Sequence, residues 1–303
     1  MNTDNNNTTK LSNSVINERL AYVDFKLRFT GHISRADLGE TFGIAEAAAS
    51  RVLKEYGEIR PDNKTQKANT IIRENFSPLI SIDGDTALGM LANGFNKNKL
   101  TNNTIIPYVK IGAIPHQLNA SDVAMITRAI SGGYAITCKY LSENSDNHGE
   151  RTILPLAIMY DGTQWMYRGC YRAKDSSTEF KNFRFTRTID ITEKHQDKEF
   201  KRLEHEELAN DKAWNLRLPL ALKLHSNLNE EKKSQIRKDF GIPEDSDELF
   251  VSERQALIWM IKRKWYIDDR SSEQKNQEEK LKRFFQFELT NVDMIKMLES
   301  QVR

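Results

Sequence analysis

Two arginines stand four residues apart in one short segment, QWMYRGCYRAKD. If this segment is extended, Trp165, Tyr167 and Tyr171 point to one face, and Arg168 and Arg172 point to the other. An aromatic face is typical of packing within a small sheet. Guanidinium groups at this spacing indicate either an anionic partner or a solvated surface.

Few other residues suggest catalytic chemistry. None of the six histidines has a zinc-protease spacing or stands beside a cysteine as in a nucleophilic pair. Neither a phosphate-binding loop nor a dinucleotide fingerprint is present, and Cys138 and Cys170 are too few for a disulfide framework or a thiolate zinc site. We therefore expect no enzyme activity, no catalytic residue, no metal and no cofactor.

The composition is that of a soluble protein of mixed charge. The 303 residues carry a net charge of +2, and 29% of them are charged, so any contact with nucleic acid must come from local patches. No apolar run approaches the roughly 20 residues that span a bilayer, and no secretion signal opens the chain. We expect a cytoplasmic protein without membrane contact.

The N-terminal region predicts three helices. After an Asn/Thr-rich start, INERLAYVDFKLRFTG predicts a buried helix that ends at Gly31. A second helix opens at Ser34, with Asp37 at the reciprocal position of a capping box, and Gly43 turns the chain into a third helix, IAEAAASRVLKEYGEI. Two short helices about a glycine turn, after a longer one, indicate a helix-turn-helix.

The side chains on the outward face of the third helix are small or polar. In a major groove Ser50, Arg51 and Lys54 can meet phosphates or base edges, and the Ala47 methyl can meet a thymine methyl. The next segment, RPDNKTQKANTIIRENFSPLI, fits a two-stranded wing with lysines at its tip. The predicted DNA-binding residues are Ser34, Arg35, Glu46, Ala47, Ser50, Arg51, Lys54, Lys64 and Lys67. Helical bundles without DNA partners and solvated hairpins share these patterns, so both alternatives stay open.

The middle of the chain changes from helical to alternating periodicity. A helix over ASDVAMITRAISGG, capped by Ser121, precedes four candidate strands, and Asp161-Gly162 is a hairpin signal. The candidate strands are 134–142, 151–160, 164–172 and 182–191. Several short antiparallel strands after one helix suggest a small SH3-like or Sm-like barrel. Arg184 and Arg187 fall on opposite faces of the last strand, so at most one of them can join Arg168.

The composition changes again after residue 200. WNLRLPLALKL alternates like a strand, NEEKKSQIRKDFG is an amphipathic helix ended by Gly241, and Ser252 to Gln255 reads as a capping box that opens another helix. The run SSEQKNQEEKLKR is expected to be a solvated loop or helix face. This region predicts a third, α+β module.

The order and spacing of these modules resemble those of WYL-domain transcriptional regulators, especially the BrxR/CapW branch, which regulates bacterial phage-defence operons. The resemblance is carried by RLAYVDFKLRFTGHISRADLGETFGI, AAASRVLKEYGEIRPDN, ILPLAIMYDGTQWMYRGCYR, FRFTR and LRLPLALKLHSNLNEEKKSQIRKDFGI. At the signature itself the chain has Trp165-Met166-Tyr167 in place of Trp-Tyr-Leu, which puts the role of the second signature residue in question.

The resemblance implies a pocket that binds a nucleotide or nucleic-acid fragment and so changes DNA affinity. Its residues map onto Tyr140, Ser142, Arg168 and Arg187. The alternative is structural: Tyr140 and Ser142 simply end a strand, and Arg187 pairs with an acid such as Asp161 or Asp190.

We therefore expect an α+β multidomain fold with an N-terminal winged helix-turn-helix, a central SH3/Sm-like β-barrel (the WYL domain) and a small C-terminal α+β dimerisation domain. The expected boundaries are a disordered tail at 1–14, a DNA-binding domain at 15–79, a connector at 80–118, a sensor domain at 119–200 and a dimerisation domain at 201–303.

The expected function is sequence-specific binding of double-stranded operator DNA by a homodimeric repressor of its own phage-defence operon. One alternative is an activator with the same architecture, which the sequence does not separate from a repressor. Another is an adaptor that binds RNA or single-stranded DNA through the barrel.

Overall fold

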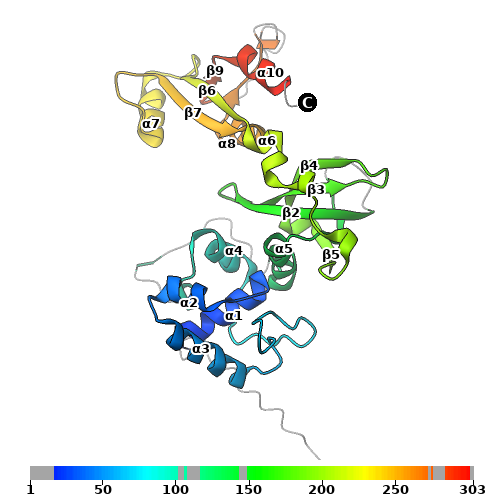
Figure 1. Cartoon of the computed structure of the whole chain (residues 1–303). Helices are drawn as coiled ribbons and strands as arrows, with labels where there is room; N and C mark the ends of the chain where they lie inside the picture. The colour runs from blue at the N-terminus through cyan, green and yellow to red at the C-terminus, as the bar shows by residue number, and fades with distance from the viewer. Residues whose placement is uncertain are drawn as a thin grey trace, which may run out of the picture. The chain divides into compact units, whose positions relative to one another are not determined.

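The computed structural model describes residues 17–101, 106–107, 117–142, 149–271, 274–275 and 284–300. The expected disordered tail and most of the run SSEQKNQEEKLKR lie outside these residues. The chain divides into two compact units, Met1–Glu206 and Glu207–Arg303 (Figure 1). Within the described residues no helix is both long and apolar enough to cross a membrane.

The first unit begins with the three expected helices, α1 (Glu18–Thr30), α2 (Arg35–Phe42) and α3 (Glu46–Ile59). Gly31 ends α1 at a φ of 83°, and Gly43 ends α2 at a φ of 63°, a region that favours glycine. The capping box at Ser34 is present, because the Ser34 hydroxyl accepts from the Asp37 amide and the Asp37 carboxylate accepts from the Ser34 amide. These features confirm the predicted helix-turn-helix.

Helix α1 is buried around much of its circumference because it is covered on several sides. It packs against α3 and also against α5 (Ala120–Gly132), and all three helices contribute to one core. The segment expected to be a connector adds α4 (Gly84–Asn93) and the 3-10 helix η1 (Lys97–Leu100), and the α4 side chains Ala87, Leu88 and Met90 are buried in this same core.

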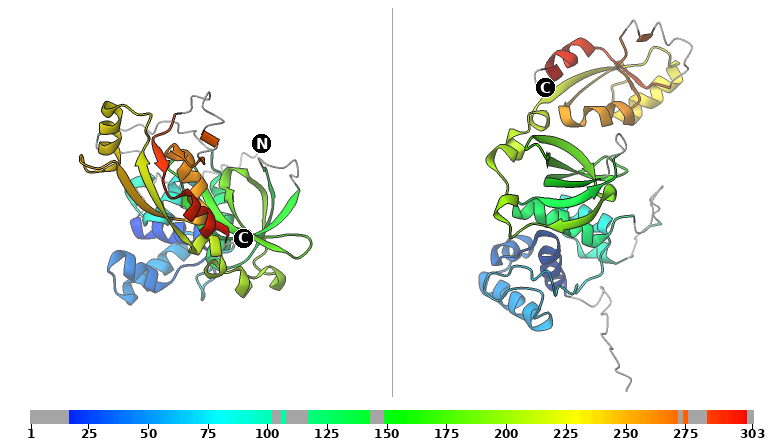
Figure 2. Two further views of the ribbon diagram at one scale, coloured as in Figure 1. Left: turned by 90° about the horizontal axis from the view of Figure 1, so that it is seen from above. Right: turned by 90° about the vertical axis from the view of Figure 1, so that its right-hand side faces the viewer.

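Helix α5 lies between α1 and a five-stranded antiparallel sheet (Figures 1 and 2). Its N-cap is Asn119, whose side chain accepts from the Ser121 amide at 2.8 Å, so the expected cap at Ser121 is wrong by two residues. The strands are β1 (Ile136–Tyr140), β2 (Glu150–Tyr160), β3 (Trp165–Arg172), β4 (Thr178–Arg184) and β5 (Thr188–Glu193).

The strand order is β4-β3-β2-β1-β5, with β4 and β5 at the edges. A closed barrel is therefore not confirmed for the described residues. The single strand expected over 182–191 is also wrong. It is divided by the 3-10 helix η2 (Phe185–Arg187), where the Thr188 hydroxyl donates to the Arg184 carbonyl at 3.0 Å.

The two faces of β3 differ as the sequence predicts. Trp165 and Tyr167 are buried in the core that includes α5, whereas Cys170 packs in a separate cluster with Leu154 on the opposite face. Three short 3-10 helices follow the sheet: η3 (Lys198–Phe200), η4 (Glu204–Glu206) and, opening the second unit, η5 (Leu208–Asn210).

The second unit has its own core and a four-stranded sheet in the order β7-β6-β9-β8. Strand β6 is antiparallel to β7 and β9, and β8 is parallel to β9. The strands are β6 (Arg217–Leu224), β7 (Glu248–Arg254), β8 (Ile267–Asp268) and β9 (Phe287–Leu289). The helices are α6 (Lys212–Asn215), α7 (Glu230–Phe240), η6 (Gln255–Leu257), α8 (Ile258–Lys264) and α10 (Val292–Ser300).

The predicted strand at WNLRLPLALKL corresponds to β6, and α7 ends at Gly241 as expected. The capping box expected at Ser252 is wrong. Ser252 lies within β7, opposite Pro219 of β6, and α8 begins at Ile258 without a side-chain cap. Together the two units make a mixed α+β protein whose sheets are mainly antiparallel.

Candidate nucleic-acid interface

Helix α3 presents a polar stripe to solvent. Ala47, Ser50, Arg51 and Lys54 are all exposed, while Ala49, Val52, Leu53 and Tyr56 on the other side of the helix are buried. Residues three and four apart share a helix face, so these exposed side chains form one continuous surface. The surface combines one hydroxyl and two cations, which suits contact with phosphates and base edges.

The segment after α3 folds into the predicted wing. Its hairpin is marked by a bridge between Lys64 and Ile71, a second bridge joins Thr70 to His32 just after α1, and Lys67 is exposed at the tip. Lys64 is not at the tip as expected. It is only 8% exposed, and its ammonium donates to Asn69 Oδ1 at 2.8 Å. Burial lowers the pKa of Lys64.

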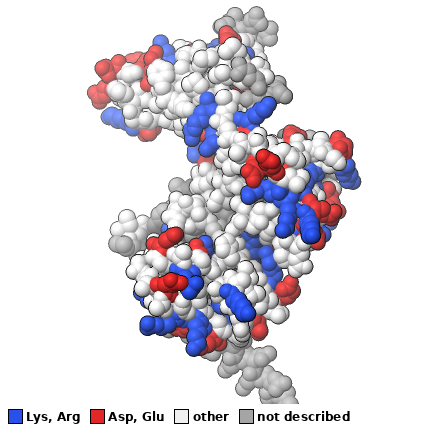
Figure 3. All heavy atoms as spheres, viewed as in Figure 1, with Lys and Arg blue, Asp and Glu red and all other residues white. Residues whose placement is uncertain are grey.

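A groove of about 840 Å³ separates α3 from the wing and brings many predicted residues together. Six of them line it: Ser34, Arg35, Ser50, Lys54, Lys64 and Lys67. Glu46, Ala47 and Arg51 do not line this groove. On the face seen in Figure 3, Lys and Arg side chains gather at the lower margin of the first unit among acidic ones, and again over its sheet.

The cations of this interface differ in how far they are neutralised. Arg35 Nη1 lies 2.7 Å from Glu46 Oε1, and Lys54 Nζ lies 3.8 Å from Glu58 Oε1. Within the described part of the chain, Arg51 and Lys67 have no ion-pair partner. They are therefore the two cations most available to an external anion.

A buried carboxylate that the sequence reading missed holds α1 and α3 together. Asp24 accepts from the Tyr56 hydroxyl at 2.6 Å and from the amides of Leu79 and Ile80 at 2.9 and 3.2 Å. Asn63, at the root of the wing, donates to the Tyr56 hydroxyl at 2.8 Å. Burial raises the pKa of Asp24, although the hydrogen bonds oppose this. An aspartate within the apolar LAYVDFKLRF was the signal.

The four predicted ligand residues do not all meet. Tyr140 is buried beside Phe183, its hydroxyl accepts from the Arg184 amide, and the Leu141 amide donates to the Arg187 carbonyl. This corner of the sheet also holds Ser142.

Arg168 lies elsewhere. Arg168 follows Tyr167 on β3, and adjacent residues of a strand point to opposite faces of the sheet. Tyr167 points to the same core face as Tyr140, so Arg168 points to the other face. There it is buried and donates to Asn182 Oδ1 at 2.9 Å. The structure therefore brings Tyr140, Ser142 and Arg187 to one corner and does not bring Arg168 to them.

The sheet carries further cations that the sequence reading did not select. The Arg151 guanidinium lies 5.3 Å from the ring centre of Tyr140 and 5.7 Å from that of Tyr171, and Lys181 Nζ lies 5.2 Å from the Tyr171 ring. We call Tyr140, Arg151, Tyr171 and Lys181 the aromatic-cation row, with one residue from each of β1 to β4. The signal was their position two residues from, or within, the core-facing residues of the four strands, which places them on the same face of the sheet as the core.

The anion beside Arg172 belongs to the chain itself. Arg172 Nε and Nη2 donate to the two carboxylate oxygens of Glu206 at 2.6 and 2.7 Å. Glu206 is fully buried, and although burial opposes ionisation, the bond from Arg172 holds its pKa below the usual range. The second guanidinium of QWMYRGCYRAKD is thus a structural partner.

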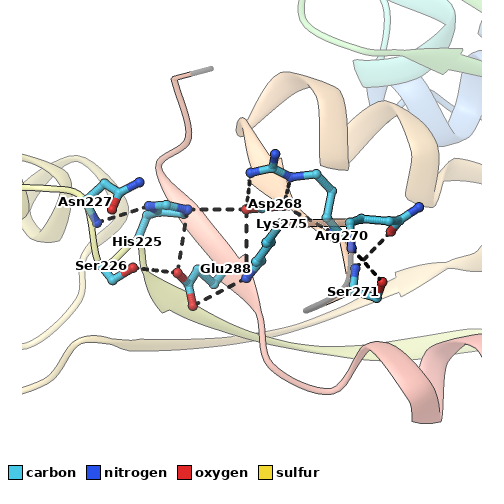
Figure 4. Close-up of polar contacts among 9 residues, drawn as sticks. His225, Ser226, Asn227, Asp268, Arg270, Ser271, Lys275 and Glu288 are labelled. Carbon is cyan, nitrogen blue, oxygen red and sulfur yellow. Dashed lines mark hydrogen bonds and ion pairs between the residues drawn. The ribbon is translucent and has the colours of Figure 1, made fainter. Parts of the chain in front are cut away.

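The second unit contains a charged cluster that resembles a catalytic arrangement in composition only (Figure 4). His225 Nε2 lies 3.4 Å from Asp268 Oδ2, and the Asn227 amide donates to His225 Nδ1. The Ser226 hydroxyl, however, donates to Glu288 at 2.8 Å and not to the histidine, so no serine–histidine–aspartate relay forms. Burial opposes ionisation of Asp268, but bonds from Arg270 lower its pKa to about 2.

The described residues contain no group of three or more His, Cys, Asp or Glu side chains placed to hold a metal ion.

Comparisons with known proteins support the winged helix-turn-helix at the start of the chain. Residues 16–91 match the BrxR transcriptional regulator winged helix-turn-helix domain. The DNA-binding transcriptional repressor CapW of Escherichia coli (strain KTE188) is 27% identical over 255 residues, covering 79% of each chain. CapW of Pseudomonas aeruginosa is 25% identical over 291 residues, covering 92% of this chain and 90% of the relative.

Two solved structures show limited similarity. Proteasome accessory factor B/C (PafBC) of Arthrobacter aurescens has a TM-score of 0.25 at 16% identity, covering 78% of this chain and 42% of that chain. A CRISPR Cas-related protein has a TM-score of 0.35 at 10% identity, covering 94% of this chain and 85% of that chain. The match over residues 16–91 and the CapW relatives confirm the resemblance of the chain to BrxR/CapW-like WYL regulators.

Proposed function

We propose that this protein is a DNA-binding transcriptional repressor that binds a double-stranded operator through α3 and the wing. The observation that carries the proposal is the exposed stripe of Ser50, Arg51 and Lys54 beside a groove whose other wall carries Lys67. A helix of this width fits the major groove, and a cation on the wing then lies near the phosphate backbone. Similarity to relatives named as transcriptional repressors supports repression over activation.

The repressor acts as a cytoplasmic homodimer and has no catalytic activity. Two copies of α3 then meet a pseudo-palindromic operator with half-sites one or more helical turns apart, roughly 10 base pairs each. We assign dimerisation to the C-terminal unit, as the family resemblance implies, and assign the operator to the promoter of the chain's own phage-defence operon.

The sheet of the first unit is the sensor. The corner formed by Tyr140, Ser142 and Arg187 shares Tyr140 with the aromatic-cation row, in which the Tyr140 and Tyr171 rings lie beside the cations of Arg151 and Lys181. Bases stack on aromatic rings and phosphates attract cations, so the ligand class is a nucleotide or a short nucleic-acid fragment. The same row favours a second candidate function, an adaptor that binds RNA or single-stranded DNA through the sheet.

Fluorescence anisotropy separates these functions. The purified chain is titrated against the duplex upstream of its own gene, against a scrambled duplex and against each single strand, at two salt concentrations. The repressor is expected to prefer its own duplex and to weaken as salt rises. Preference for single strands would instead support the adaptor.

Charge reversal locates the interface. Arg51→Glu is expected to abolish preference for the promoter duplex, because it replaces an unpaired cation of α3 with an anion. Lys198→Glu is the matched control, since Lys198 is an exposed cation of the same unit, on η3 and away from the groove. Equal loss in both variants would contradict the assignment of α3 to the interface.

A further inference from the structure

One carboxylate collects donors from three parts of the first unit. Glu193, at the end of β5, accepts from Arg128 of α5, from Tyr134 and, at 3.4 Å, from Arg73. The Glu193 side chain is 8% exposed, and that of Arg128 is 10% exposed. We call Arg73, Arg128, Tyr134 and Glu193 the Glu193 cluster. Burial opposes ionisation of Glu193, but hydrogen bonds from Arg128 and Tyr134 lower its pKa.

Arg128 extends this cluster to the helix-turn-helix. Its Nη1 donates to the Arg28 carbonyl, in the last turn of α1, at 2.7 Å. The aliphatic part of Arg128 lies against Gly31, where a Cβ would be 3.6 Å from the Arg128 Cδ. The Gly31 carbonyl in turn accepts from the Ile71 amide of the wing at 2.8 Å. Arg128 therefore contacts the point at which α1 ends and the wing is attached.

Arg73 reaches the cluster from the wing itself. It follows Ile71 and Ile72, which close the hairpin by pairing with Gly31 and Asn63. The wing is thus connected to Glu193 by two routes, directly through Arg73 and indirectly through Arg128. Both routes end on the same carboxylate of the sheet.

Strand β5 connects this carboxylate to the corner of the proposed ligand site. Glu193 pairs with Ile136 at one end of β5, and Thr188 pairs with Tyr140 at the other. The β1–β5 pairing is irregular between Thr137 and Lys139, and Asp190 has a φ of 53°. A bulge of this kind disrupts the ladder locally and bends the strand, so the two ends of β5 are not held by one continuous ladder.

We propose that Glu193 is a positioning residue for DNA binding, which fixes the wing and the end of α1 against the sheet. This inference rests on the proposed DNA-binding function. It deepens that function, because it names the residue through which a change at the sheet reaches the DNA-binding surface. Neither Glu193 nor Arg128 lines the groove between α3 and the wing, so both act through the wing and not by contact with DNA.

The test compares two buried ion pairs of the same unit. Glu193→Gln keeps the shape of the side chain and removes its charge. Glu206→Gln likewise removes the charge of a buried carboxylate, the one that pairs with Arg172. The hydrogen bonds of the Arg172 guanidinium go to Glu206 and to the carbonyls of Glu199 and Lys201, and none goes to the wing. Binding of each full-length variant to the promoter duplex is measured by anisotropy across a salt series, well below the unfolding temperatures of both variants.

Glu193→Gln is expected to weaken binding about tenfold or more, and Glu206→Gln by no more than about twofold. The slope of log Kd against log salt concentration is expected to stay unchanged in Glu193→Gln, because no phosphate contact is removed. Hydrogen exchange supplies a readout free of DNA: amides 63–72 of the wing are expected to exchange faster in Glu193→Gln alone.

Two results would overturn the inference: wild-type affinity and wing protection in folded Glu193→Gln, or equal weakening by Glu206→Gln. If Glu193→Gln does not fold, Tyr134→Phe replaces it, since this change removes one donor and leaves both arginines in place. Weakening of about threefold then supports the positioning role, and unchanged binding overturns it. Failure of the unaltered chain to prefer its promoter duplex is a separate result, which removes the proposed function and this inference with it.

Discussion

Arg35 and Glu46, the first residues of α2 and α3, form an ion pair with 2.7 Å between Arg35 Nη1 and Glu46 Oε1. Both side chains are more than half exposed, at 57% and 71%. An exposed pair of this kind contributes little to stability. Its larger effect is electrostatic, because Glu46 neutralises a cation at the edge of the groove.

Glu46→Gln is therefore expected to strengthen binding to both promoter and scrambled duplexes, by about twofold to fivefold at low salt. The salt slope is expected to steepen by up to about 1, since Arg35 becomes free to contact a phosphate. Anisotropy titrations over a salt series measure both quantities. Weaker binding to the promoter duplex alone would contradict this and make Glu46 a base-reading residue.

The two wing lysines are expected to respond differently to substitution. Lys67→Ala removes an exposed cation, so it weakens binding to all duplexes and lowers the salt slope by about 0.9 without a loss of stability. Lys64→Met keeps the buried stem but removes the bond to Asn69, which costs about 1 kcal/mol of unfolding free energy and leaves the slope unchanged.

Urea unfolding and the salt series together separate these two roles. A lower salt slope in Lys64→Met would show that its ammonium reaches DNA after all.

The sequence predicts elements whose signals are local. Gly31, Ser34 and Gly43 mark the helix-turn-helix directly, and alternation on β3 assigns its faces correctly. The split of the strand expected over 182–191 depends on a side chain, because the Thr188 hydroxyl bonds to the Arg184 carbonyl and favours a turn over a continuous ladder. Ser252 fits a helix cap locally, but pairing with Pro219 of β6, distant in sequence, places it in a strand.

The residues of the candidate site likewise divide into those that a local sequence pattern predicts and those whose position depends on contacts distant in sequence. The exposed stripe of α3 could be predicted from helical period alone. Burial of Lys64 depends on the hairpin that brings Asn69 to it, with Asn69 at a φ of 49°. The Glu193 cluster joins residues 59 to 120 positions apart, and no pattern within one segment indicates such contacts.

Tyr56→Phe is expected to destabilise the winged helix. The change leaves Asp24 without its hydroxyl donor and removes one of the two acceptors of the Asn63 side-chain amide, which still donates to the Ser77 carbonyl; both residues are buried. The expected loss is about 1 to 3 kcal/mol of unfolding free energy. Tyr266→Phe is the control, because that hydroxyl belongs to a side chain that is 51% exposed. Equal stability of the two variants in urea unfolding would show that the Asp24 network contributes little.

Acid is expected to destabilise the second unit through Asp268, whose pKa is about 2 in the folded chain against an ordinary 3.8. Above about pH 5 the carboxylate is ionised in both folded and unfolded chains, and its stabilisation, about 2 kcal/mol, is fully present. As the pH falls from about 4 to 2, the unfolded chain takes up the proton first, so this stabilisation is lost.

Asp268→Asn removes the group that titrates. The variant is expected to be less stable than the wild type at pH 7 and to show a flatter decline of unfolding temperature between about pH 4 and pH 2. Tryptophan fluorescence follows this unit, because Trp214, Trp259 and Trp265 belong to it and only Trp165 belongs to the other. Asp239→Asn, an exposed carboxylate on α7, is the matched control and is expected to retain the full decline. If Asp268→Asn also retains it, the acid response arises from other carboxylates, such as Glu288, which shares Lys275 with Asp268.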